Sequence, residues 1–214
     1  MSVHQEEPLF GRRALLAGGI AGVGALAAAA ETDAAPQDET PSPSPALSER
    51  LADIKQAWLE MIGPFPSEKP ALELDMRRVD DIEGIECHYL TFLSEGDDRV
   101  PAYLLIPETA RPGPSPALVC PHPTSTGAGK AQCVGLTGRA LEDPPLPPEQ
   151  SRAYGLELAR WGYVTISIDL FGDGERIPEG HTRYDSEPFY ARHPEWSTFG
   201  KNAWDCMRAL DVLE

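Results

Sequence analysis

The chain has 214 residues, of which 41% are apolar, and a formal net charge of −16. This length and this apolar fraction suit one domain with appendages and a real hydrophobic core. The excess of acidic residues repels polyanions, so nucleic acid is excluded as an expected partner.

The N-terminus predicts an export signal of the twin-arginine type over residues 1–30. Arg12 and Arg13 precede an uncharged, Gly/Ala-rich segment at 14–30, which is short for a membrane span. Small residues at 28–30 offer a cleavage site, and an uncleaved anchor is the alternative interpretation. We therefore expect an exported protein, periplasmic or extracellular, without membrane contact once the signal is removed.

Residues 31–47 are rich in proline, serine and acidic residues, which predicts an extended or disordered linker before a domain at 48–214. Ser48 predicts the N-terminus of a helix, and Gly63-Pro64 predicts its end. Apolar side chains recur at helical spacing between them. We interpret this stripe as a docking face rather than a cofactor-binding motif. The stripe consists of Leu51, Ile54, Trp58 and Ile62.

Strand signals dominate the next part of the chain. The segments 85–95 and 100–108 flank a Gly-Asp-Asp turn and predict a β-hairpin. A third strand begins at Ala117. A helix is predicted from about residue 150 to 161, where Gly162 ends it.

The segment 163–170 is β-branched and almost continuously apolar, as expected of a central parallel strand that is covered on both faces. A final helix begins at Ser197 and continues to the last residue. We expect its inward face to carry Phe199, Ala203, Met207, Leu210 and Leu213. This order predicts an α/β fold whose sheet starts with an antiparallel hairpin and continues with parallel strands joined by helices.

Gly129-Lys130 resembles the end of a phosphate-binding loop, but the spacing excludes a nucleotide site. The G-x-x-x-x-G-K-[ST] motif needs a glycine where Thr124 stands and a hydroxyl where Ala131 stands. A metal site has no support either, because no histidine pair has i, i+4 helical spacing and no cysteine pair has C-x-x-C spacing. We therefore expect no cofactor and no metal.

The acidic segment DLFGDGE at 169–175 follows the second buried strand. We interpret it as a solvated turn, with Asp169 as a structural hydrogen-bond acceptor rather than a catalyst. Glu175 and Arg176 are expected to form an ion pair at the surface or at the rim of a pocket.

The loop CPHPTSTG at 120–127 follows the third predicted strand, at the carboxyl edge of the sheet, where open parallel sheets place their sites. In serine hydrolases of the α/β type, a backbone N–H in this loop stabilises the oxyanion of the tetrahedral intermediate. Pro123 has no N–H. The expected donor is therefore the Thr124 N–H, with Ser125 as the alternative, and a plain Pro-rich turn is the competing interpretation.

Together these segments resemble the α/β-hydrolase superfamily, in particular its dienelactone-hydrolase-like and acetyl-xylan-esterase-like branches. PALVCPHP at 116–123 looks like the third strand and oxyanion loop, with Pro123 where the family usually has glycine. The segment 154–176 looks like the first helix, the fourth strand and the following turn, and 189–214 looks like the approach to the fifth strand. The resemblance covers roughly residues 70–214.

The resemblance implies a serine hydrolase that acts on a small-molecule carboxylic or carbohydrate ester. In this superfamily the fifth strand leads into the nucleophile elbow G-x-S-x-G, and the acid and the histidine follow it. No G-x-S-x-G occurs in this sequence. We therefore expect the N-terminal part of such an enzyme, which lacks the Ser/Asp/His triad and is inactive alone. The alternative is a non-catalytic remnant or binding module of the same origin.

No motif identifies the ester or the oligomeric state. Four aromatic residues near the predicted final helix could line a pocket or pack their loop onto the sheet, and we expect the packing role. They are Tyr184, Phe189, Tyr190 and Trp196.

Overall fold

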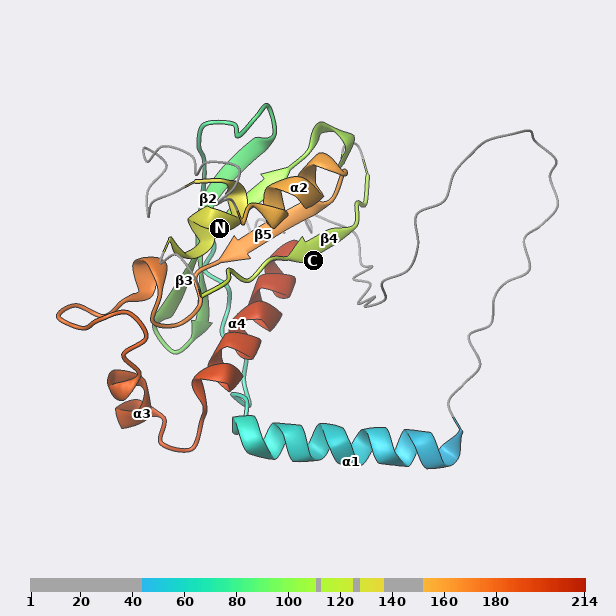
Figure 1. The fold of residues 1–214 in the computed structure, drawn as a ribbon, viewed down its shortest axis with the longest axis vertical. Helices are drawn as coiled ribbons and strands as arrows, with labels where there is room; N and C mark the ends of the chain where they lie inside the picture. Colours follow the sequence, from blue (N-terminus) through green and yellow to red (C-terminus); the bar gives the residue numbers. More distant parts are fainter. Residues whose placement is uncertain (1–43, 111–112, 125–127, 137–151) are drawn as a thin grey trace, which may run out of the picture.

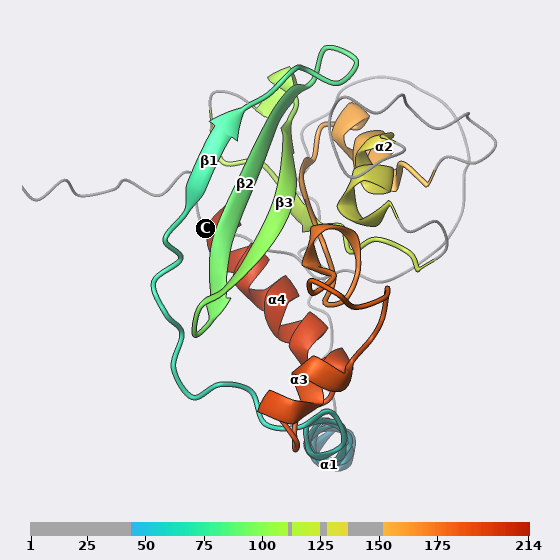
Figure 2. The same cartoon turned by 90° about the vertical axis from the view of Figure 1, so that its left-hand side faces the viewer.

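The computed structural model describes residues 44–110, 113–124, 128–136 and 152–214. Within these ranges the chain forms a five-stranded mixed sheet in the order β1-β2-β3-β5-β4, with helices on both faces (Figures 1 and 2). The predicted export signal at 1–30 and most of the predicted linker lie outside the described residues.

Helix α1 spans Pro45–Ile62 and so begins before the predicted linker ends. The N-terminal cap is Ser44 rather than the expected Ser48, because the Ser44 hydroxyl accepts a hydrogen bond from the Leu47 N–H at 3.3 Å. A proline at the first helical position suits this start, since it has no N–H to satisfy. Gly63 follows the last helical residue with a φ of 91°, which confirms the predicted end.

The predicted hairpin is confirmed by β2 (Glu86–Glu95) and β3 (Asp98–Ile106), which pair in antiparallel register. Strand β1 (Asp75–Arg78) adds to the free side of β2. The sequence does not predict β1, because its four residues, DMRR, are all exposed and lack the alternation of a half-buried strand.

Strand β5 (Val164–Ile168) is central and buried at every residue, as predicted. It pairs in parallel with β4 (Ala117–Val119) on one side and antiparallel with β3 on the other. The described sheet is therefore mostly antiparallel, and the predicted parallel arrangement holds only for the pair of β4 and β5.

Alternate residues of β3 divide the core into two layers. Ala102 and Leu104 pack with helix α4 (Thr198–Leu213) on one face, and Tyr103 and Leu105 pack with helix α2 on the other. Helix α2 spans Tyr154–Arg160, and Gly162 follows it with a φ of 96°, as the predicted stop requires. A further short helix, α3, spans Glu187–Arg192.

The expected inward face of the final helix is wrong at Phe199 and Met207. Phe199 is 77% exposed and Met207 is 37% exposed, while Lys201, Asp205 and Arg208 of the same helix are buried. Charged residues are buried here because they have ionic partners, some within α4 and others outside it. Lys201 pairs with Asp205 and Arg208 with Asp211 along the helix, while Asp98 and Arg176 pair with Lys201 and Asp205 from the hairpin and from the loop after β5. Helical periodicity assigns charged residues to the solvent face, so it does not predict that this charged face is buried.

None of the helices in the described residues is both long and apolar enough to cross a bilayer. The four cysteines are all unpaired, and Cys206 alone retains partial exposure.

Candidate functional site

The loops that follow β4 and β5 lie together at one edge of the sheet. The two strands are parallel neighbours, so the segments 120–124 and 169–176 leave the sheet on the same side (Figure 1). This edge is where the sequence predicts the oxyanion loop. The same edge also receives the short helix η2 (Gly129–Val134), which packs on β5.

Asp169, the first residue after β5, is fully buried and collects three hydrogen bonds. It accepts from the Lys130 N–H at 2.6 Å, the Lys130 ammonium at 2.8 Å and the Glu175 N–H at 2.9 Å. The prediction of a structural acceptor is confirmed. The backbone approaches so closely that a Cβ on Gly129 or Gly174 would lie 2.2 Å from Asp169 Oδ1. Both positions therefore require glycine.

Lys130, part of the sequence that resembles a phosphate-binding loop, points into the protein. Its side chain is 2% exposed and forms ion pairs with Asp169 and Glu175. The ammonium nitrogen also lies over the rings of Tyr89 and Tyr103, 5.5 and 5.3 Å from their centroids. Lys130 therefore ties η2 to the loop after β5.

The interpretation of 169–175 as a solvated turn is wrong, because Asp173 is also fully buried. Its carboxylate accepts from the Gly174 N–H at 2.8 Å and from the Tyr184 hydroxyl at 2.7 Å. It also lies 3.1 Å from Arg183 Nε. Burial of both aspartates is possible because the chain supplies a donor for each carboxylate oxygen.

The expected ion pair between Glu175 and Arg176 does not form. Glu175 faces Lys130, while Arg176 is buried on the other side and lies 2.7 Å from both Asp98 and Asp205. Burial alone lowers the pKa of the Arg176 guanidinium, but Asp205 and Asp98 outweigh this effect and leave the pKa raised. This network joins the loop after β5 to the hairpin and to α4.

His122 connects the two loops. It is 3% exposed, and its Nε2 accepts a hydrogen bond from the Leu170 N–H at 3.0 Å. The ring proton therefore lies on Nδ1, which is 3.1 Å from the Pro123 carbonyl oxygen and donates to it. The buried Gln132 amide donates to the same oxygen at 3.1 Å.

These two bonds orient the peptide unit between Pro123 and Thr124. A peptide unit is planar and trans, so its N–H points away from its carbonyl. The Pro123 carbonyl faces the buried side chains of His122 and Gln132, and the Thr124 N–H consequently faces the opposite way. No residue in the described ranges accepts a hydrogen bond from this N–H, and Thr124 is exposed.

Arg183 holds the same loop from outside. Its guanidinium donates to the Thr124 carbonyl and, at 2.7 Å, to the Tyr184 hydroxyl. The alternative donor of the sequence prediction, Ser125, lies outside the described residues. No motif in the sequence predicts the roles of Gln132 and Arg183, because both depend on backbone carbonyls that only folding brings near them.

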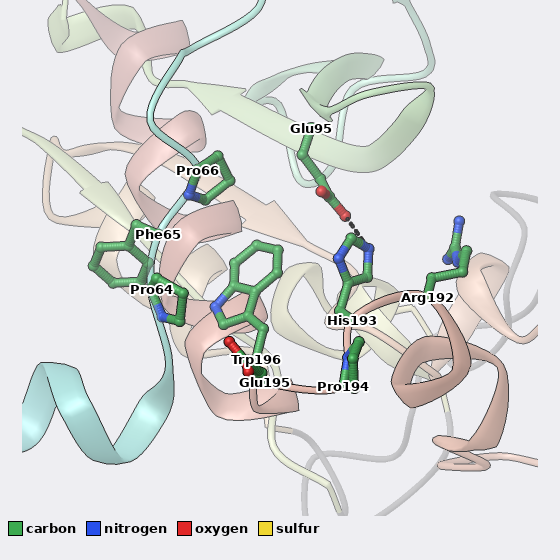
Figure 3. Close-up of a pocket in the computed structure, with 9 residues that line it drawn as sticks. All are labelled: Pro64, Phe65, Pro66, Glu95, Arg192, His193, Pro194, Glu195 and Trp196. Atoms are coloured by element: carbon green, nitrogen blue, oxygen red, sulfur yellow. Dashed lines mark ion pairs between the residues drawn. The ribbon is translucent and has the colours of Figure 1, made fainter.

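A separate cavity of about 440 Å³ lies at the end of β2 (Figure 3). Glu95 and His193 point toward each other in its wall, with Oε1 and Nε2 3.2 Å apart, whereas Arg192 points away. β2 runs in the same direction as β5, so this cavity opens at the same edge of the sheet. The lining residues within the described ranges are Pro64, Phe65, Pro66, Glu95, Arg192, His193, Pro194, Glu195 and Trp196.

The four aromatic residues near the final helix do not share one role, either packing or lining a pocket. They are Tyr184, Phe189, Tyr190 and Trp196. Phe189 is fully buried and packs with Trp196 and Trp204, so the packing role is confirmed for it. Trp196 both packs in this cluster and lines the cavity. Tyr184 and Tyr190 are more than 40% exposed.

Comparison with known proteins identifies the fold. No protein-family model and no curated protein matches the chain. Among solved structures, the chain is similar to that of a Bacteroides fragilis protein described as a candidate acetyl xylan esterase, with a TM-score of 0.58 and 21% sequence identity. The match covers 79% of this chain and 44% of that one, so the chain spans less than half the length of this neighbour.

The chain thus has an α/β fold like that of this candidate esterase, which confirms the predicted fold class. At 21% identity the likeness concerns the fold alone. Catalysis must be argued from the residues at the carboxyl edge of the sheet.

Proposed function

We propose that the chain is the N-terminal part of a serine ester hydrolase of the dienelactone-hydrolase-like or acetyl-xylan-esterase-like branch. In this proposal it supplies the first half of the sheet and one oxyanion-hole donor, the Thr124 N–H. The nucleophile, the acid and the catalytic histidine belong to a segment outside this sequence, since the G-x-S-x-G elbow does not occur in it. The substrate is a small carboxylic or carbohydrate ester.

The orientation of the Thr124 N–H carries the proposal. An oxyanion donor must be aimed before the reaction, so that no reorganisation is needed when charge develops on the substrate oxygen. Here His122 and Gln132 hold the Pro123 carbonyl, and Arg183 holds the Thr124 carbonyl. The peptide units on both sides of the Thr124 Cα are thereby held in place. The Thr124 N–H, which belongs to the first of them, points away from the side chains of His122 and Gln132.

His122 does not suit the role of catalytic base. Its Nε2 already accepts from the Leu170 N–H, and its Nδ1 proton is used by the Pro123 carbonyl. Both ring nitrogens are therefore engaged in holding the loops, so we assign His122 a positioning role.

We further propose that the protein is exported through the twin-arginine signal at 1–30 and has no lasting membrane contact after cleavage. Support comes from Arg12-Arg13 and the Gly/Ala-rich segment that follows. Edman sequencing of the protein recovered from the periplasm would give the cleavage site, and protein retained in the cytoplasm would contradict export.

The decisive test compares Thr124→Pro with Thr124→Ala in the protein encoded by the complete gene. Proline removes the N–H, whereas alanine keeps it. With an aryl acetate substrate we expect Thr124→Pro to lower kcat about 100- to 1000-fold with little change in KM, and Thr124→Ala to retain activity.

Circular dichroism and the unfolding midpoint of both variants separate a lost donor from a lost fold. Equal activity of the two folded variants would show that the loop is only a turn. The 214-residue chain by itself is expected to release no product from the same ester. Turnover abolished by a serine-directed inhibitor in that chain would contradict the assignment of the triad to another segment.

A further inference from the structure

Helix α1 carries an apolar stripe that no described part of the chain covers. Its members are Leu47, Leu51, Ile54, Trp58 and Met61, with exposed fractions between 47% and 68%. The sequence places Ile62 in this stripe, but Ile62 is instead the one buried residue of the helix, and Leu47 and Met61 extend the exposed stripe. Single apolar residues on a surface need no explanation, but a continuous stripe along an 18-residue helix marks an interaction site.

The stripe has the spacing of a coiled-coil seam. Its members follow one another at intervals of four, three, four and three residues, which is the 3.5-residue repeat of two helices packed along their length. The positions that flank the seam are polar or small, and the outer face is acidic. The flanking residues are Ser48, Arg50, Lys55 and Ala57, and the outer acidic residues are Glu49, Asp53 and Glu60.

We propose that α1 pairs with α1 of a second copy of this chain as an antiparallel two-helix coiled coil. The charges beside the seam favour the antiparallel over the parallel arrangement. In a parallel pair, Arg50 of each helix would face Lys55 of the other copy, because these positions oppose each other across the seam. Two such contacts between like charges oppose parallel pairing.

The same charges select one antiparallel register. With Leu51 opposite Ile54 of the second copy, Arg50 faces Ala57 and Lys55 faces Ser48, so no like charges meet. Sliding the helices by one seam step, which sets Ile54 opposite Trp58 of the second copy, would bring the two Lys55 side chains together. In the first register Leu47 faces Trp58 and Leu51 faces Ile54 of the second copy, so four of the five stripe residues are buried without repulsion, and Met61 lies opposite Ser44.

The way in which α1 joins the rest of the domain is consistent with antiparallel pairing. The chain leaves α1 at Gly63, where the first turn of α4 packs on the helix end, and the N-terminal half of α1 extends past the sheet (Figure 1). In the antiparallel register the two ends at Ile62 lie about 28 Å apart along the axis. In a parallel pair they would lie about 10 Å apart, so the two domains would sit side by side at one end of the pair.

A membrane surface is the other partner that an amphipathic helix can take. Anionic lipids bind helices with basic polar faces. The polar face of α1 instead carries three acidic residues against two basic ones, on a chain of net charge −16. The charge balance therefore favours a second copy over an anionic bilayer.

Sedimentation equilibrium of the 214-residue chain between about 1 and 100 µM tests the proposal. We expect the average mass to rise from that of a monomer toward that of a dimer, and Ile54→Glu to abolish the rise. Gln56→Glu adds the same charge on the opposite face of the helix and should leave dimerisation unchanged; because it also removes the hydrogen bond from Gln56 to Glu60, circular dichroism must show the same helix content as in the wild type. Ile54 is half exposed, so its replacement spares the fold, which circular dichroism checks.

Ser48→Glu tests the register. In the proposed pair the introduced carboxylate faces Lys55 of the second copy twice, so the dimer should tighten about two- to fivefold, whereas Gln56→Glu should not tighten it. A parallel or shifted pair offers the introduced carboxylate no such partner, and an unchanged or weakened dimer would overturn the proposed register.

Three results would overturn the pairing itself. They are a monomer at every concentration, a dimer that survives Ile54→Glu, and a monomer that co-sediments with phosphatidylcholine or phosphatidylglycerol vesicles through Ile54. The last result would assign the stripe to a lipid surface. None of these measurements depends on ester hydrolysis, so they stand apart from the test of the oxyanion donor.

Discussion

The loops after β4 and β5 and the helix α1 use their side chains in opposite ways. In the loops, charged residues such as Asp169, Asp173 and Lys130 are buried and paired. On α1, large apolar residues such as Trp58 are half exposed, and Ile62 alone is buried. The loops are therefore determined by contacts within the domain, whereas α1 presents a surface for contacts outside it.

This difference predicts where substitutions act. Removal of a buried charge leaves its partners desolvated and unpaired, which costs several kcal/mol. Removal of an exposed apolar group changes the folded monomer little. Variants in the two regions can therefore be ranked by their expected effect on the free energy of unfolding.

The largest effect is expected for Asp169→Ala. It leaves two backbone N–H groups without their acceptor and removes one of the two carboxylates that pair with the Lys130 ammonium, so that Glu175 alone remains. We expect a loss of about 3–5 kcal/mol in the free energy of unfolding, measured by urea denaturation. The matched control Asp53→Ala on α1 should stay within about 0.5 kcal/mol of the wild type. Equal losses in the two variants would contradict the difference between buried, paired charges in the loops and exposed charges on α1.

A smaller but still large effect is expected for Gly129→Ala. Its φ is 55°, and the added Cβ would lie 2.2 Å from Asp169 Oδ1. The control is Gly84→Ala, which has a φ of 79° but no atom within 4 Å of the added Cβ. We expect about 1 kcal/mol for the control, from backbone strain alone, and about 3 kcal/mol for Gly129→Ala, measured by thermal unfolding. A smaller loss at Gly129 than at Gly84 would contradict the close packing.

The buried network also predicts an acid dependence of stability. Burial raises the pKa of Asp205, but Arg176 and Lys201 outweigh it and hold the pKa below its ordinary value. This carboxylate therefore stabilises the fold above the unfolded pKa of about 3.9 and loses its contribution as pH falls toward the folded pKa. The free energy of unfolding should decline below about pH 4, and Asp205→Asn should flatten that decline. An unchanged slope in the variant would exclude Asp205 as its source.

The smallest effect is expected on α1 itself. Leu51→Ala removes a half-exposed side chain, so the free energy of unfolding of the dilute monomer should change by less than about 0.5 kcal/mol. Leu105→Ala, in a fully buried position of β3, is the matched comparison and should cost about 2–5 kcal/mol. A large loss at Leu51 would mean that the stripe is covered within one chain.

Several features of the fold could be predicted from local patterns. Gly63 and Gly162 end helices because their backbone conformation suits glycine, and the run at 163–170 has the composition of a buried strand. The hairpin follows from its turn residues. Strand β1 could not be predicted, since DMRR is exposed at every residue and its strand character is seen only in its pairing with β2.

The sequence predicts where the candidate site lies but not which side chains orient its donor. Pro123 directs attention to the Thr124 N–H because proline has no donor. Gln132 and Arg183 orient that N–H, yet neither belongs to a motif. Their partners are backbone carbonyls, one of them from a segment 59 residues away in sequence, and a carbonyl has no signature in the amino-acid sequence.

Local patterns in the amino-acid sequence specify most of the elements, their order and the edge where the loops after β4 and β5 meet, because hydrophobic period and turn chemistry act over short stretches of chain. Contacts between distant elements determine that Phe199 faces solvent while Lys201 and Asp205 lie inside, and that the acidic turn after β5 is buried. The burial of a charge depends on whether a partner from another element can neutralise it. Such a partner is brought close only by folding, so hydrophobic periodicity and turn residues in the sequence do not predict which charges are buried.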